Sequence, residues 1–123
     1  QWFCPAPWRV AEARIDLRPG GAFDTDMRGP GAGEAHLSRG CFLVVEPQRR
    51  LVFTDCLTEG FQPADAPFMT AEVSFEDAAG GGTHYVARAL HKDAATRDQH
   101  AAMGFEPGWG AAADQLDALA LSL

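Results

Sequence analysis

Apolar and polar residues alternate along most of the first ninety positions, which is the period of a β-strand. The clearest segment is 22–28, where Phe23, Thr25 and Met27 share one face and charged residues occupy the other. Pro19-Gly20 before it predicts a tight turn, because proline presets the first central position and glycine accepts a positive φ at the second. The same reasoning predicts six strands, at residues 10–17, 22–28, 34–46, 50–57, 68–76 and 83–92. Residues 58–67 hold a glycine and two prolines and predict an irregular loop.

The period changes after residue 92, where alanine becomes frequent. Asp93 suits the N-cap of a short helix that runs to Met103. Residues 104–107 interrupt this helix, and Pro107 suits the first turn of a second one, where its missing amide donor is harmless. Apolar residues then recur at spacings of three and four, which predicts a helix with one face on a sheet. That stripe consists of Trp109, Ala112, Ala113, Leu116, Leu119, Ala120 and Leu123.

Short connections between the strands favour antiparallel neighbours, because a parallel crossover needs a dozen or more residues. Six consecutive strands followed by helices predict an α+β fold in one domain over residues 1–123. A chain of this length is expected to build a self-sufficient hydrophobic core.

The net charge of -7, with only ten Lys and Arg residues, makes nucleic acid and anionic membranes poor partners. The sequence has no apolar run long enough for a membrane span and no signal peptide. Cys4, Cys41 and Cys56 are odd in number and widely spaced, which favours free thiols in a reducing, cytoplasmic location.

Several short motifs, in order, resemble the activators of heat-shock protein 90 ATPase, a branch of the START and birch-pollen-allergen-like superfamily. They begin with Gln1-Trp2-Phe3-x-Pro5, then residues 16–23 (Asp-Leu-Arg-Pro-Gly-Gly-x-Phe) with Met27, then Gly40 and residues 47–54 (Pro-x-x-Arg-Leu-Val-Phe-Thr). The later motifs are Thr83, His91, His100, Gly104-Phe105-x-x-Gly108-Trp109, Leu116 and Leu119. Together they cover nearly the whole chain.

The resemblance implies a helix-grip fold, in which a curved antiparallel sheet of about six strands grips a long C-terminal helix. It also implies a pocket between them for an apolar or amphipathic small molecule. Its expected lining residues are Trp8, Phe23, Met27, Phe42, Phe53, Met69, Tyr85, Phe105 and Trp109. For each of them, simple core packing is the alternative.

Family members usually open with a strand and one or two short helices before the Trp-x-x-Pro segment, and this sequence begins after them. The domain is therefore expected to be incomplete at its N-terminus relative to the family. An open sheet edge would favour a homodimer. The three aromatic residues among the first eight suggest the alternative that this segment is tucked into the core.

The four histidines lack the spacing of a metal site, and no nucleophile lies beside a base, so we expect no metal, no cofactor and no catalytic residue. His91 and His100 are expected to approach the same pocket mouth, where an acid-base role or a surface role is open. Asp55 is expected to form a cross-strand ion pair with Arg14 or Arg88, either exposed or as a polar hook beside Tyr85.

Three functions remain open at this point. The first is non-enzymatic binding of an apolar or amphipathic small molecule. The second, implied by the family name, is a co-chaperone-like module that contacts an ATPase chaperone, through an exposed patch near residues 61–68. The third is a cyclase or aromatase-like enzyme, which a pairing of Tyr85 with His91 in the cavity would favour.

Overall fold

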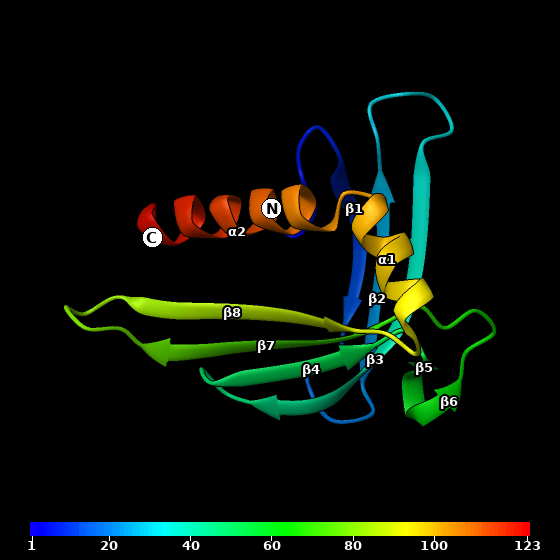
Figure 1. Ribbon diagram of the computed structural model, residues 1–123, viewed down its shortest axis with the longest axis horizontal. Helices are drawn as coiled ribbons and strands as arrows, with labels where there is room; N and C mark the ends of the chain where they lie inside the picture. The colour runs from blue at the N-terminus through cyan, green and yellow to red at the C-terminus, as the bar shows by residue number, and fades with distance from the viewer.

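The computed structural model describes residues 1–123 and confirms the predicted α+β fold, with one bent antiparallel sheet and two helices (Figure 1). The sheet is a meander in the order β1-β2-β3-β4-β7-β8, so each strand pairs with its neighbours along the chain. Its strands are β1 (Arg9–Ile15), β2 (Ala22–Arg28), β3 (Ala35–Glu46), β4 (Arg50–Thr54), β7 (Thr70–Asp77) and β8 (Thr83–Leu90). The predicted six strands are confirmed, with ends that differ by a few residues.

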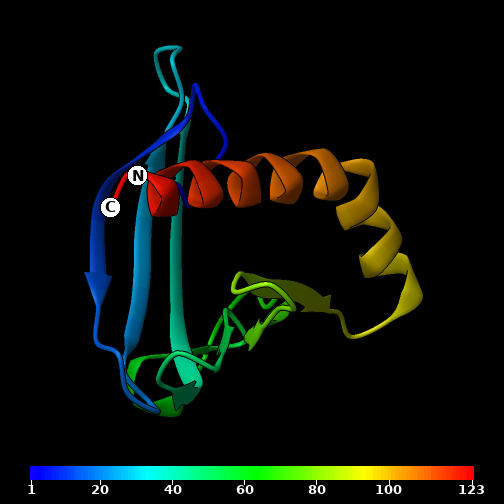
Figure 2. The same cartoon turned by 90° about the vertical axis from the view of Figure 1, so that its left-hand side faces the viewer.

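A bulge in β3 bends the sheet. The first half of β3 pairs with β2 and the second half with β4, and the register shifts between Phe42 and Val44. A bulge adds a residue to one strand and increases its local twist. Figure 1 shows the result: β1, β2 and the start of β3 run across the direction of β4, β7 and β8. The concave side of this bend faces the C-terminal helix (Figure 2).

The segment predicted as an irregular loop contains a small hairpin, formed by β5 (Leu57–Thr58), the 3-10 turn η1 (Glu59–Phe61) and β6 (Gln62–Pro63). Phe61 has a φ of 60°, which the residue type does not predict. The hairpin packs on the turn between β1 and β2, where the amide of Gly60 donates to the carbonyl of Gly20 at 2.8 Å. A side chain at Gly20 would come within 2.7 Å of the Phe61 ring, so this contact requires glycine.

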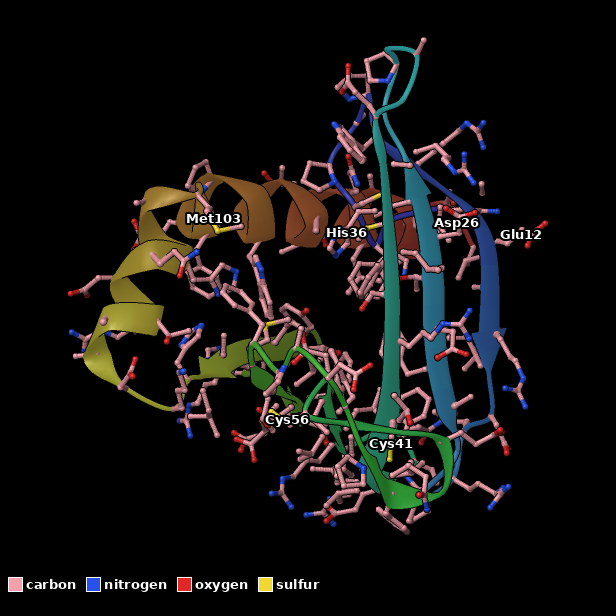
Figure 3. All side chains as sticks on the ribbon, turned by 90° about the vertical axis from the view of Figure 1, so that its right-hand side faces the viewer. Glu12, Asp26, His36, Cys41, Cys56 and Met103 are labelled. Carbon is pink, nitrogen blue, oxygen red and sulfur yellow. The ribbon has the colours of Figure 1, made fainter.

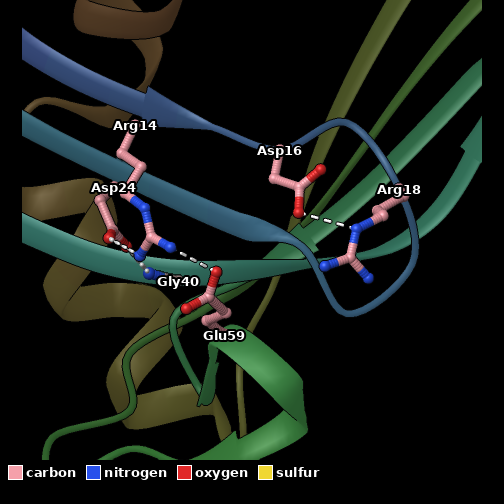
Figure 4. A network of polar contacts seen from close by, with 6 residues as sticks. All are labelled: Arg14, Asp16, Arg18, Asp24, Gly40 and Glu59. Carbon is pink, nitrogen blue, oxygen red and sulfur yellow. Dashed lines mark hydrogen bonds and ion pairs between the residues drawn. The ribbon is translucent and has the colours of Figure 1, made fainter.

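One ion pair of a small surface network also reaches this hairpin. Arg14 bonds Glu59 at 2.6 Å and lies 3.9 Å from Asp24, and Asp16 pairs with Arg18 at 2.7 Å (Figure 4). On β2, Asp24 alternates with Phe23 and Thr25, as the period-2 pattern predicts.

The two helices are α1 (Ala94–Ala102) and α2 (Phe105–Leu121). Asp93 is the predicted N-cap of α1, and its carboxylate accepts the Thr96 amide at 2.8 Å. Gly104, at a φ of 93°, interrupts the helical conformation between α1 and α2. Because α2 begins at Phe105, Pro107 lies in its first turn, as predicted. Neither helix combines the length and the apolar character that crossing a membrane requires.

Gln115 of α2 ties the helix to the start of the chain. Its side-chain amide nitrogen donates to the carbonyls of Trp2 and Cys4, each at 2.9 Å, and its oxygen accepts the Ala6 amide at 2.9 Å. Phe3 in turn contacts Phe23 of β2, with the ring centroids 5.6 Å apart. Residues 1–8 therefore form a strap that bridges α2 and the concave face of the sheet.

The buried core is smaller than the chain length predicts. Only 14 of the 123 residues are buried. The accessible surface is 8192 Å², whereas a compact monomer of this mass exposes about 6400 Å². The helix contacts the sheet mainly through the strap, so part of the apolar concave face stays accessible.

Replacing Gln115 with Glu is expected to loosen the strap. In the parent chain, two strap carbonyls accept hydrogen bonds from the Gln115 amide nitrogen. The variant keeps the shape of the side chain but places a carboxylate oxygen, which cannot donate, against these carbonyls. We expect the free energy of unfolding in urea to fall by about 2 kcal/mol, together with faster hydrogen exchange in residues 1–8.

Ala118→Glu is the matched control, because it adds the same charge on an exposed turn of the same helix. Its free energy of unfolding is expected to stay within about 0.5 kcal/mol of the parent. Equal free energies of unfolding in the two variants would show that the hydrogen bonds of Gln115 do not hold the strap.

Candidate functional site

An apolar groove of about 510 Å³ lies between the strap, β2 and the corner where α1 meets α2. Seven of its ten lining residues are hydrophobic. Figure 3 shows Met103 at this helix corner. The lining residues are Cys4, Pro5, Ala6, Trp8, Met27, His100, Met103, Gly104, Phe105 and Trp109.

One groove-lining residue, His100, forms a histidine pair with His91. His91, directly after β8, and His100, on α1, approach with 2.8 Å between Nε2 of His91 and Nδ1 of His100. The two histidines meet, but only His100 lines the groove, so the expectation that both approach the pocket holds for His100 alone. His100 is only 9% exposed, whereas His91 is half-buried. A single proton is shared across this contact, so one ring donates and the other accepts.

Aromatic rings surround the pair. Phe68 packs edge-on against both imidazoles, with centroids 5.8 Å from His91 and 4.8 Å from His100. Phe105 lies 4.8 Å and Trp109 6.2 Å from His100. Rings at these distances and tilts gain edge-to-face contacts in addition to the apolar area they bury. The imidazoles are therefore held in place by packing on several sides.

Burial keeps His100 neutral. Removal from water lowers the pKa of its imidazole, and the charge that His91 can carry lowers it further. Burial likewise raises the pKa of the Cys4 thiol, which favours the uncharged form. No Lys, Arg, Asp or Glu side chain lines the groove. The groove is thus uncharged along its whole length at neutral pH.

Four of the nine residues expected to line a pocket meet in this groove, and they are Trp8, Met27, Phe105 and Trp109. They come from the strap, from β2 and from the first turns of α2. Residues far apart in the sequence therefore form one surface.

Three others, Phe23, Phe42 and Phe53, stack on one another across β2, β3 and β4. Phe23 lies 4.9 Å from Phe42 and 4.6 Å from Phe53, and Phe42 is 2% exposed. These rings form an aromatic cluster on the bent sheet, in which Phe42 is buried and the other two are half-buried, and they lie outside the groove lining.

Met69 and Tyr85 also lie outside the groove lining. The carbonyl of Met69 accepts the Thr54 hydroxyl at 3.1 Å. Tyr85 packs on Phe75 with centroids 5.5 Å apart, and burial raises the pKa of its hydroxyl.

The residues that sequence reasoning missed come from the strap and from the helix corner. Cys4, Pro5, Ala6 and Met103 line the groove, although none has an aromatic side chain. The one signal for them was the cluster of aromatic residues at the start of the chain, which suggested a tucked segment.

The expected ion pair of Asp55 with an arginine is wrong. Asp55 instead accepts the backbone amides of Phe68 and Met69, at 2.8 and 3.0 Å. Arg14 pairs with Glu59, and Arg88 lies 3.6 Å from Glu72. A short polar side chain in a turn often bonds nearby amides instead of a distant charge. By doing so, Asp55 orders the chain that presents Phe68 to the histidines.

A second, wider hollow lies beyond the ends of the β3–β4 and β7–β8 hairpins, with a volume of about 1030 Å³. Only one of its seven lining residues is hydrophobic. It lacks the apolar walls that small-molecule sites usually have, so the groove beside the histidine pair is the better candidate. No group of three or more His, Cys, Asp or Glu residues stands close enough to hold a metal ion.

The buried histidine makes stability depend on pH. Because the pKa of His100 is lower in the folded chain, the unfolded chain binds more protons as the pH falls. The contribution of neutral His100 to the free energy of unfolding is complete above the unfolded pKa of about 6.5. It is lost as the pH falls through the folded pKa. We expect the free energy of unfolding in urea to decline from pH 8 to pH 5.

His100→Phe is expected to flatten that decline, because phenylalanine fits the aromatic surroundings and cannot titrate. His84→Phe is the control, since His84 is an exposed histidine on β8. An unchanged slope in His100→Phe would show that His100 does not carry the pH dependence.

Comparison with known proteins now places this arrangement in a family. The family model described as activator of Hsp90 ATPase homolog 1-like protein matches residues 1–120. A solved structure from Nitrosomonas europaea is 41% identical, with a TM-score of 0.90 over 96% of this chain and 75% of that one. A protein from Mycobacterium smegmatis is 30% identical, with a TM-score of 0.67 over 92% of this chain and 68% of its own.

A protein from Rhodobacter sphaeroides, 20% identical, shares the fold with a TM-score of 0.79 over 99% of this chain and 75% of that chain. No curated protein matches the chain. The sequence motifs, the bent sheet that grips α2 and the match over residues 1–120 agree with one another. The chain belongs to the family of activator of Hsp90 ATPase homolog 1-like proteins.

Proposed function

We propose that this protein binds an apolar or amphipathic small molecule in the groove between the sheet, the strap and the C-terminal helix. The observation that carries the proposal is the groove itself, which is open to solvent and has seven hydrophobic residues among its ten. Its volume of about 510 Å³ falls within the range of small-molecule sites, roughly 300 to 1000 Å³.

The lack of charge in the groove supports the same proposal. A charged group of a ligand would lose its hydration in the groove and find no ion there to pair with, and this desolvation is costly. The indole rings of Trp8 and Trp109 and the ring of Phe105 offer wide apolar surfaces instead. Such a surface gains free energy in proportion to the apolar area of ligand that it covers.

The family description also suggests a module that contacts an ATPase chaperone. The patch expected for such a module, at residues 61–68, is not one continuous surface in the structure. Phe61 is 50% exposed and rests on Gly20, whereas Phe68 packs against the two histidines. Within this segment the two phenylalanines thus do not form one exposed patch, which favours the ligand-binding proposal.

A cyclase or aromatase-like activity has less support. Tyr85 and His91 lie six residues apart along one extended segment, which corresponds to about 20 Å. Tyr85 packs against Phe75. The two side chains therefore do not act together in one cavity.

Native mass spectrometry of the purified protein is the first test. We expect a non-covalent adduct that disappears on denaturation, or an adduct that forms after incubation with a mixture of neutral lipids and polyketides. A clean unliganded mass under both conditions would contradict the proposal.

Fluorescence of the neutral probe N-phenyl-1-naphthylamine gives a second test, because its emission rises in apolar sites. Trp109→Ala removes a wall of the groove and is expected to weaken probe binding about tenfold. Phe61→Ala, which removes an aromatic ring outside the groove, is the control and is expected to leave the affinity unchanged. Equal affinities of the two variants would place the probe elsewhere.

A further inference from the structure

The second ring nitrogen of His100 is a polar group without a protein partner, on a residue that lines the groove. Nδ1 of His100 faces His91, and no protein group bonds Nε2. No buried side-chain nitrogen or oxygen lacks a partner in the structure, so Nε2 keeps contact with solvent. His100 is 9% exposed, and it is one of the groove-lining residues. Its small accessible area thus includes the one ring nitrogen that has no partner.

We propose that Nε2 of His100 is the polar anchor of the groove and forms a hydrogen bond with the hydroxyl group of an uncharged aromatic ligand. The inference rests on the ligand-binding function proposed above and names the chemical class of the ligand. His91 acts as a positioning residue, since it reaches the ligand only through His100.

The shared proton of the pair explains why the ligand group is a hydroxyl. When His91 donates to Nδ1 of His100, the proton of His100 lies on Nε2, which then donates to the ligand. When His100 donates instead, Nε2 is an acceptor. A hydroxyl both donates and accepts, so it matches either tautomer, whereas a carbonyl oxygen matches only the first.

The surroundings of His100 disfavour a carboxylate ligand. No lysine or arginine lines the groove, and the whole chain carries a net charge of -7. A carboxylate could accept from a neutral Nε2–H, but no cation in the groove would offset the desolvation of its charge. Burial among Phe68, Phe105 and Trp109 also disfavours the protonated imidazole that could pair with it. The anchor is therefore suited to an uncharged oxygen.

The walls beside the anchor favour an aromatic ligand. Phe105 and Trp109 lie 4.8 Å apart and both approach His100. A flat ring that packs against them would carry its hydroxyl toward Nε2. Stacked and edge-to-face contacts with these rings add to the apolar area that the ligand buries.

Three probes of similar shape separate these contributions. Naphthalene, 2-naphthol and 2-naphthoate differ only in one substituent, and binding is read from quenching of the tryptophan fluorescence at pH 7.5. We expect 2-naphthol to bind roughly fivefold more tightly than naphthalene, as one buried hydrogen bond gives. We expect 2-naphthoate to bind more weakly than both.

His100→Phe is expected to abolish the preference for 2-naphthol over naphthalene, because phenylalanine has no ring nitrogen to bond the hydroxyl. His91→Phe keeps His100 but removes its partner, and it is expected to reduce the preference without abolishing it. His84→Phe changes an exposed histidine on β8 and is expected to keep the full preference.

The outcomes separate the two proposals. Equal binding of naphthalene and 2-naphthol to the parent protein would overturn the hydroxyl anchor and leave the ligand-binding function standing. A preference that survives in His100→Phe would also overturn the anchor. Failure of all three probes to bind the parent protein would overturn both proposals. The comparison of probes on the parent protein stands even where a variant fails to fold.

Discussion

The side-chain amide of Gln115 is the interaction on which the site depends. One primary amide offers two donors and one acceptor, and here it meets two carbonyls and one amide of the strap. Without these three bonds, residues 1–8 would have no polar attachment to α2. The strap supplies Cys4, Pro5, Ala6 and Trp8 to the groove, so the shape of the groove depends on the segment that Gln115 attaches to α2.

The strap also explains why the accessible surface is large for a chain of this mass. The strap stands between α2 and the sheet, and Phe3 reaches Phe23 while Gln115 holds the neighbouring backbone. The stack of Phe23, Phe42 and Phe53 fills the bend of the sheet, but the helix corner stays clear of it. Few buried residues imply a modest stability, which a ligand that binds only the folded chain would raise.

Sequence reasoning recovered the fold because its signals are local: alternation marks the strands, and Asp93 marks a helix start. The hairpin at residues 57–63 escaped because the positive φ of Phe61 is set by contacts with the β1–β2 turn. The site was recovered only in part, because alternation shows which residues share a face of the sheet but not which of them lie under the strap. Phe42 and Trp109 look alike in sequence, yet one fills the sheet and the other lines the groove.

The histidine pair shows how a buried polar group can be held without a charge. One nitrogen of each imidazole has its hydrogen-bond partner in the other ring. The pair therefore tolerates an aromatic environment that an isolated ion would not. A purely structural pair would need no open nitrogen, because phenylalanine could fill the same space among Phe68, Phe105 and Trp109. Nε2 of His100 remains unpartnered and reaches solvent, and His100 itself lines the apolar groove. A polar group so placed adds nothing to packing, and its position suits the recognition of one atom in a ligand that is otherwise apolar.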